Sequence, residues 1–183
     1  MIMIGSVLMD FRDIVEFFKD AFKYIAVVIV VLLLFIFVMG LQQIVGPSME
    51  PNLKEGDILI VNKLLYHIGK IKRNDIVVIT EEEKYMVKRV VGLPGEHIEY
   101  KDNYVYVDGE KYRETFIDTE KVKTEDFKLE DLGYDKIPEG MYLVLGDNRE
   151  NSKDSRDYGL VPKKQIVGKA WLRIWPFNKI RFF

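Results

Sequence analysis

An uninterrupted apolar segment near the N-terminus constrains the fold more than any other feature of this chain. Residues 24–41 contain no charged side chain, and residues 25–39 are all apolar. Eighteen helical residues rise roughly 27 Å at about 1.5 Å each, which is close to the hydrocarbon thickness of a bilayer. The segment exceeds the roughly 7–15 apolar residues of a cleaved signal sequence, and no small-x-small cleavage pattern follows it. It therefore predicts a retained transmembrane anchor over residues 24–41, with a cleaved signal sequence as the alternative.

The charges beside this segment indicate its orientation and exclude one class of partner. Residues 1–23 carry apolar side chains at helical spacing and are predicted to extend the same helix. Lys19 and Lys23 flank the apolar segment, which favours a cytoplasmic N-terminus and an extracytoplasmic domain over residues 42–183. The chain has 27 Lys and Arg against 29 Asp and Glu, a formal net charge of -2, so nothing indicates a nucleic acid partner. The partner predicted at this end of the chain is the lipid bilayer.

Short strand patterns separated by turn residues fill the rest of the chain. Runs of β-branched and aromatic residues bounded by Gly, Pro, Asn or Asp occur at 58–61, 76–79, 85–91, 104–107 and 141–145. Asp108-Gly109 after the fourth of these runs is typical of a tight hairpin. Few segments have the helical length that a βαβ unit needs. The patterns predict a mainly β domain of antiparallel sheet, preceded by one N-terminal transmembrane helix.

Two further segments have a distinct composition. Residues 110–136 are dense in charges of both signs and poor in periodic apolar positions, which favours a solvated excursion with a short helix at about 124–132. At the C-terminus, basic residues alternate with aromatic ones that resemble interfacial membrane anchors: Trp171, Trp175, Phe177, Phe182 and Phe183. The alternative is a last β-strand that packs Trp171 and Ile174 into the core. We expect both, with the final aromatic residues nearer the membrane.

A serine between two prolines lies close behind the apolar segment, in Gly46-Pro47-Ser48-Met49-Glu50-Pro51. Residues 42–47 can carry Ser48 only roughly 20 Å beyond that segment, because an extended chain rises about 3.3–3.6 Å per residue. A substrate of Ser48 must therefore present itself at the membrane face. A serine hydroxyl is a weak nucleophile and needs a base. Neither His67 nor His97 has the neighbouring acid and serine of a triad.

Lys88 is the other candidate for this base. In a strand, Met86, Lys88 and Val90 share one face. A lysine on an apolar face is desolvated, which lowers its pKa and leaves a neutral amine able to accept a proton. The alternative, which spacing alone favours, is that Lys88 extends to water while Arg89 is buried and paired.

The segment from Gly146 to Gly159 is too polar to enter a core, yet it follows a strand of buried type. Its carboxylates suggest a calcium loop, but Ser152 replaces the required glycine and Tyr158 replaces the final Glu. We expect instead a loop held by Asp–Arg hydrogen bonds. Since the chain has no cysteine and only two histidines, no metal centre and no cofactor are predicted.

Together these segments resemble the type I signal peptidases, membrane-bound serine endopeptidases that remove signal peptides from exported preproteins. Behind the anchor, the matching blocks are G-P-S-M-E-P-N-L, K-R-N-D-I-V-V-I, Y-M-V-K-R-V-V-G-L-P-G-E and G-D-N-R-E-N-S-K-D-S-R-D-Y-G, over residues 46–159. The resemblance implies the LexA-like β fold, preproteins as partners, and location in the cell membrane. It also implies cleavage after small residues at the −1 and −3 positions.

By the same resemblance, Ser48 is the nucleophile and Lys88 the general base, which reverses the choice that spacing favours. The backbone N–H of Ser48 would be one oxyanion donor, while Gly46 stands where some relatives carry a second, hydroxyl donor. Ser152 matches the serine that orients the lysine amine. Asp154 and Arg156 match the pair that supports this region in the family, and Asp147 and Arg149 belong to the same supporting loop. The chain departs from the common pattern at Asn52, Asn74 and Met86.

Three alternatives remain open from the sequence. The self-cleaving repressor and mutagenesis proteins use a serine–lysine pair on the same fold, but they are soluble. Relatives with histidine in place of the lysine are disfavoured by Lys88. A non-enzymatic membrane-tethered β module, in which the serine is incidental, predicts that Ser48→Ala and Lys88→Ala leave every activity intact.

Overall fold

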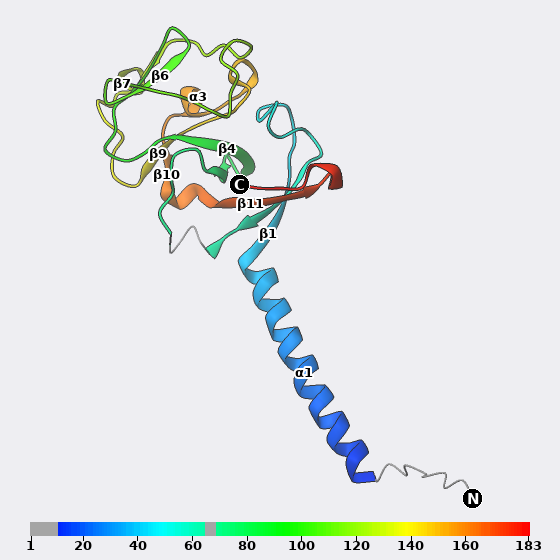
Figure 1. Ribbon diagram of the computed structural model, residues 1–183. Coiled ribbons are helices and arrows are strands. Elements are labelled where there is room, and N and C mark those ends of the chain that lie inside the picture. The colour runs from blue at the N-terminus through cyan, green and yellow to red at the C-terminus, as the bar shows by residue number, and fades with distance from the viewer. Residues whose placement is uncertain (1–10, 65–68) are drawn as a thin grey trace, which may run out of the picture. The chain divides into compact units, whose positions relative to one another are not determined.

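The computed structural model describes residues 11–64 and 69–183, and the chain divides into two units after Val38. The first unit contains helix α1, Phe11–Val38 (Figure 1). Within the described residues, one helical stretch is long and apolar enough to cross a membrane, Ile14–Val38, with a mean hydropathy of 2.9. The helix ends three residues before the predicted end of the anchor, because Met39–Gln43 pair with another strand as β1.

The second unit is built from antiparallel sheets, which confirms the predicted fold class. Every strand pairing in the described part of the chain is antiparallel. The larger sheet has the order β1-β2-β11-β3-β4-β9-β10, and β12 pairs with β11. Its strands after β1 are β2 (Ile58–Asn62), β3 (Ile76–Glu81), β4 (Lys84–Gly92), β9 (Met141–Leu145), β10 (Val161–Pro162), β11 (Ile166–Trp175) and β12 (Arg181–Phe182).

The smaller sheet has the order β7-β6-β5-β8. Its strands are β5 (Ile98–Lys101), β6 (Tyr104–Val107), β7 (Glu110–Tyr112) and β8 (Phe127–Lys128). The predicted hairpin joins β6 to β7, with Asp108 and Gly109 both at positive φ, as a two-residue turn of this kind requires. Short helices complete the unit: η1 (Leu129–Leu132), η2 (Arg149–Asn151), α3 (Ser155–Tyr158), η3 (Lys163–Gln165) and η4 (Phe177–Lys179).

Strand β4 lies inside the larger sheet and is covered on both faces. It pairs with β3 from Lys84 to Arg89 and with β9 from Arg89 to Gly92. Val87 packs in one core cluster and Val90 in another, so side chains that point to opposite faces of this strand are both buried. This strand therefore places any polar side chain near its centre away from water.

The charged segment 110–136 is more than a solvated excursion. It supplies β7, β8 and η1, and it buries Glu114, Thr124 and Phe127. The predicted helix at about 124–132 is a short strand followed by a single 3₁₀ turn. Most residues of the segment are nevertheless exposed, and the 3₁₀ turn at Leu129–Leu132 lies within the predicted helical range. Local composition contains no signal for its buried contacts, because the partner of Glu114 is Arg149, 35 residues away.

The C-terminal aromatic residues are largely exposed. Trp171 was an alternative candidate for the core, but its exposed fraction is 37%, whereas the preceding Ala170 is fully buried. The register between β11 and β2 shifts between Ala170 and Leu172, so Trp171 is the extra residue of a bulge and leaves the alternation of the strand. The other exposed apolar side chains of this end are Trp175, Phe177, Ile180 and Phe182, while Phe183 packs against a core cluster.

Candidate active site

Ser48 is held on a short turn between β1 and β2. The turn is closed by backbone hydrogen bonds from Glu50 N–H to Pro47 O (2.9 Å) and from Leu53 N–H to Met49 O (2.9 Å). Met49 and Leu53 are fully buried and hold the turn in the core below it. Two residues before Ser48, Gly46 has a φ of 79°, a left-handed conformation that favours glycine. The turn thus keeps Ser48 half-buried on a firmly anchored backbone.

Lys88 and its neighbour Arg89 are both buried, with exposed fractions of 2% and 7%. The sequence presented these as alternatives, one buried and the other exposed. Both are buried because core clusters cover both faces of β4. Arg89 pairs with an acid, whereas the hydrogen bond of the Lys88 amine goes to a neutral hydroxyl, Ser152 Oγ, at 3.0 Å.

The surroundings of Lys88 favour a neutral amine. Burial lowers the pKa of Lys88, and it outweighs the nearby Asp154 carboxylate, which acts in the opposite direction; the Arg156 guanidinium lowers it further. A neutral lysine has a free electron pair, which a general base requires.

Ser48 and Lys88 line the same groove, of about 240 Å³. One wall consists of residues 42–49, the other of residues 85–88, and Lys153 lies beside them. A larger cavity of about 660 Å³ borders β6 and β7, but none of the predicted site residues lines it. We therefore take the smaller groove as the candidate active site.

Gly146 allows the Ser48 turn and the Ser152 loop to approach each other closely. A Cβ atom at this position would lie 2.1 Å from Ser152 Oγ and 2.5 Å from the Ser48 carbonyl oxygen. Beside it, Asn148 N–H donates to Ser48 O at 3.0 Å, and Asn148 Nδ2 donates to Pro47 O at 3.2 Å. In the sequence, the place of Gly146 between a strand of buried type and a polar loop is the only sign of this role.

Asp154 and Arg156 form the pair that the sequence predicted in this loop. Arg156 donates from Nε and Nη2 to the two carboxylate oxygens of Asp154, at 2.8 and 2.9 Å. Asp154 also accepts the Gly146 N–H at 3.0 Å. Its burial would raise the pKa of the Asp154 carboxyl, but the bonds from Arg156, Gly146 and Ser152 prevail and hold it below the usual value. The Asp154 carboxylate is therefore charged, and it is hydrogen-bonded to Ser152.

Asp147 pairs with Arg89 rather than with a residue of its own loop. Two parallel bonds of 2.7 Å join the guanidinium to the carboxylate in a bidentate arrangement. Asn52, four residues after Ser48, donates to the same carboxylate at 2.9 Å and to Phe116 O at 2.8 Å. The Arg89 guanidinium lies 4.0 Å from the centre of the Phe116 ring. Sequence reasoning missed these contacts, which join four distant segments beneath the groove.

The other departures from the common family pattern also have structural explanations. Asn74 adopts a φ of 71°, a conformation that glycine and asparagine tolerate best, and its carbonyl accepts a bond from Arg89 at 2.9 Å. Met86 packs against a core cluster and lines the groove.

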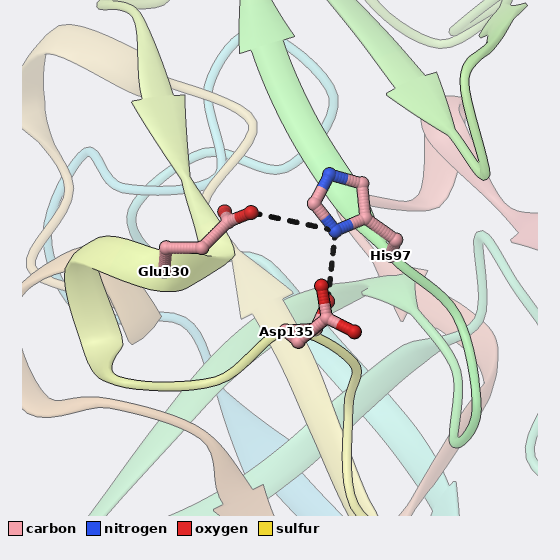
Figure 2. A group of neighbouring side chains, drawn as sticks. All are labelled: His97, Glu130 and Asp135. Carbon is pink, nitrogen blue, oxygen red and sulfur yellow. Dashed lines mark hydrogen bonds and ion pairs between the residues drawn. The ribbon is translucent and has the colours of Figure 1, made fainter.

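His97 is not placed as a partner of Ser48. His97 Nδ1 lies 2.8 Å from the Asp135 carbonyl oxygen and 3.8 Å from Glu130 Oε1 (Figure 2). His97, Glu130 and Asp135 are, among the described residues, a group whose ligand atoms are close enough to share a metal ion, but all are partly or fully exposed. None of them lines the groove. His67 lies outside the described residues.

Comparison with known proteins identifies the family. The signal peptidase family, peptidase S26, matches residues 15–175, so the chain belongs to this family. Signal peptidase I of Bacillus caldolyticus is 46% identical over 164 residues, which cover 85% of this chain and 90% of the relative. Signal peptidase IB of Staphylococcus aureus (strain MRSA252) is 40% identical over 174 residues, covering 86% and 91%.

A solved structure agrees with this classification. The crystal structure of a signal peptidase I from Enterococcus faecalis V583 aligns with a TM-score of 0.51 and 38% identity. The alignment covers 55% of this chain and 96% of the other. The activity is accordingly that of signal peptidase I, a serine endopeptidase that removes signal peptides from secreted preproteins. This confirms the family and the reaction that the sequence predicted.

Proposed function

We propose that Ser48 is the nucleophile of this peptidase and that Lys88 is its general base. The observation that carries the proposal is the burial of Lys88, with a lowered pKa, in the groove that Ser48 also lines. In the first step, Ser48 Oγ attacks the carbonyl carbon of the scissile peptide bond while Lys88 Nζ accepts the hydroxyl proton. The resulting ammonium gives this proton to the leaving amine, which leaves an acyl ester on Ser48. Neutral Lys88 then accepts a proton from the water that attacks the ester carbonyl. It returns this proton to Ser48 Oγ as the bond between Oγ and the acyl carbon breaks, which releases the carboxylic acid product and restores the free serine.

The backbone N–H of Ser48 is the proposed oxyanion donor. Within the described part of the chain, this N–H donates to no protein acceptor, so it is available to a substrate. Gly46 has no side chain and supplies no hydroxyl donor, in contrast to the relatives described above. The fixed turn beneath Ser48 supports this role, since an oxyanion donor acts best when it is held in place before the reaction.

We propose that the substrate lies extended in the groove and is cut after small residues at −1 and −3. Apolar side chains from both walls line it: Ile44, Val45, Met86 and Val87. A groove of about 240 Å³ with these walls suits short apolar side chains.

The proposed location is the cell membrane, with the N-terminus cytoplasmic and residues 42–183 extracytoplasmic. Nine residues separate Val38, the end of α1, from Ser48. Such a segment reaches at most about 35 Å when fully extended. Cleavage is thus limited to a short distance from the end of the anchor, which suits a substrate cut just beyond its own apolar helix.

The test uses the full chain in detergent or lipid vesicles with a membrane-anchored precursor that has small residues at −1 and −3. Ser48→Ala and Lys88→Ala should each lower kcat/KM by about 10³-fold or more while the circular dichroism spectrum is unchanged. Lys84→Ala, an exposed lysine on the same strand, is the matched control and should retain activity. Wild-type cleavage by Ser48→Ala would refute the proposal.

A further inference from the structure

The carboxylate of Glu114 is buried inside the catalytic unit, although it lies in a segment dense in charges of both signs. The exposed fraction of its side chain is 4%. Glu114 follows β7 and lies at the start of the loop that leads to Phe116, whose carbonyl and ring contact Asn52 and Arg89. This loop of the charged segment therefore contacts two residues that support the active site, Asn52 and Arg89. A buried carboxylate costs free energy unless it is paired, so its partners indicate its purpose.

The partner of Glu114 is Arg149, whose side chain is completely buried. Arg149 Nη2 donates to Glu114 Oε1 at 2.5 Å, and Nη1 donates to Oε2 at 3.2 Å. Tyr100 donates to Glu114 at 2.9 Å and accepts from Arg149 at 3.0 Å, and Thr124 accepts a bond from Arg149 at 3.2 Å. Burial would lower the pKa of the Arg149 guanidinium, but the nearby Tyr100 and Glu114 outweigh it and raise that pKa. The charge of Arg149 is therefore retained and held in one orientation.

The remaining donor of Arg149 points to the active-site loop. Its Nε donates to Gly146 O at 3.0 Å. Gly146 is the residue at which the Ser48 carbonyl and the Ser152 side chain come closest, and its N–H is held by Asp154. The backbone carbonyl of Arg149 accepts a second bond, from Arg156 Nη2 at 2.8 Å. Glu114 is thus connected to the Ser48 turn and the Ser152 loop through one guanidinium and one peptide unit.

We infer that Glu114 is a positioning residue of the peptidase, which acts through Arg149 to hold Gly146 between the Ser48 turn and the Ser152 loop. This inference rests on the proposed roles of Ser48 and Lys88. Glu114 touches neither of them and does not line the groove. Its effect is on the geometry of the reacting groups, where a misplacement of about 1 Å costs about 10²-fold in rate.

The competing explanation is that Glu114 and Arg149 stabilise the fold and nothing more. Loss of one partner from a buried pair destabilises a protein in any case. The chain offers a control in Glu96, a half-buried acid that pairs with an arginine, Arg73, at 2.5 Å. Glu96 also accepts the Leu93 N–H, and neither it nor Arg73 bonds to residues 146–156. Glu96→Gln removes a comparable pair that has no connection to Gly146.

The experiment compares Glu114→Gln with Glu96→Gln in the full chain, on the membrane-anchored precursor, well below both unfolding temperatures. Glutamine keeps the shape of the side chain and one acceptor oxygen, so both variants should fold. For Glu114→Gln we expect kcat to fall about 10- to 100-fold with KM nearly unchanged. Glu96→Gln should lose similar thermal stability and keep its kcat. Equal kcat values in the two variants would overturn the inference.

A pH profile provides a second readout that a purely structural role would not change. The charged groups that act on Lys88 are Asp154, Arg156, Asp157 and Asp147, and burial dominates over all of them. If the loop over Lys88 loosens, water reaches the amine, its pKa rises, and the acid limb of kcat/KM moves to higher pH. This shift is expected in Glu114→Gln and not in Glu96→Gln; its absence would also count against the inference.

The same assays separate failure of the inference from failure of the proposed mechanism. If Ser48→Ala is inactive and Glu114→Gln matches Glu96→Gln, only the positioning role is wrong. If Ser48→Ala cleaves normally, the assignment of the nucleophile fails, whatever Glu114→Gln shows.

Discussion

Lys88 Nζ donates a hydrogen bond to Ser152 Oγ at 3.0 Å, although the two residues are 64 positions apart in the chain. The sheet order explains how they meet. Strand β9 pairs with β4 so that Leu145 lies opposite Arg89, the residue next to Lys88. The loop that leaves β9 at Gly146 therefore starts beside the lysine and returns over it. The antiparallel pairing of these strands is what assembles the candidate site.

The Lys88–Ser152 bond predicts a defect in turnover rather than in substrate binding. In Ser152→Ala, the amine loses the hydroxyl that orients it, and kcat should fall about 10- to 100-fold while KM changes little. Initial rates over a range of precursor concentrations measure both constants. Lys84→Ala, which removes an exposed lysine of β4 outside the groove, is the control. An unchanged kcat in Ser152→Ala would show that the bond has no role in catalysis.

The pH dependence of cleavage should follow the deprotonation of Lys88. Since burial lowers the pKa of this lysine below its ordinary value of 10.5, kcat/KM should rise with pH and level off below 10.5. The profile is measured from about pH 5 to pH 11 on a precursor without titratable groups near the cleavage site. A rise centred near about pH 6.5 would instead indicate a histidine base.

The same lowered pKa predicts that Lys88 reduces stability at neutral pH. Between the lowered pKa and 10.5, the folded state binds fewer protons than the unfolded chain, so the free energy of unfolding rises with pH across that window. Lys88→Met should abolish this slope and raise the free energy of unfolding at pH 7 by about 1 kcal/mol or more, because a well-packed apolar residue replaces a buried amine that is harder to protonate in the folded state than in the unfolded chain. Chemical denaturation at pH 7 and pH 10 measures both effects. A variant that is less stable than wild type at pH 7 would contradict this prediction.

The proposed reacting residues, Ser48 and Lys88, could be singled out from the sequence because each belongs to a local block that resembles the family. Ser48 also lies between prolines just after the anchor, whereas the spacing of the strand alone favoured an exposed Lys88, and only the resemblance pointed to it as the base. The strands themselves were predictable for the same reason, since alternation and turn residues are local signals.

Apart from the local Asp154–Arg156 pair, the supports of the site could not be predicted, because they are contacts between distant segments. Asn52 reaches Asp147 across 95 residues, and Arg149 reaches Glu114 across 35. Composition indicated that the Glu114 side chain is exposed to solvent, because an acid in a highly charged segment usually is. The exposure of Trp171 could not be predicted either. A prediction of the buried face depends on the alternation of the strand, and a bulge changes that alternation.

Gly146 predicts the sharpest steric effect in the protein. In Gly146→Ala, the added carbon would lie 2.1 Å from Ser152 Oγ and 2.5 Å from the carbonyl oxygen of Ser48, so one of the two segments must move. We expect kcat/KM to fall about 10²-fold or more, with a loss of stability of about 1–3 kcal/mol typical of overpacking. Rates and thermal unfolding of the purified variant measure these effects. Gly109→Ala, in the hairpin turn of the smaller sheet, controls for the loss of a glycine; normal cleavage by Gly146→Ala would show that the contact is not needed.

The exposed C-terminal aromatic residues predict a difference between membrane-bound and soluble substrates. Trp175 and Phe177 pack edge to face, with ring centroids 4.8 Å apart, and both are exposed. Aromatic side chains of this kind prefer the bilayer interface, so we expect them to hold the catalytic unit against the membrane. The double variant Trp175→Ala/Phe177→Ala should cleave a membrane-anchored precursor several-fold more slowly than wild type but a short soluble peptide at the same rate. Tyr104→Ala, an exposed aromatic in the smaller sheet, should affect neither substrate. Equal losses on both substrates would mean that Trp175 and Phe177 support the fold rather than contact the bilayer.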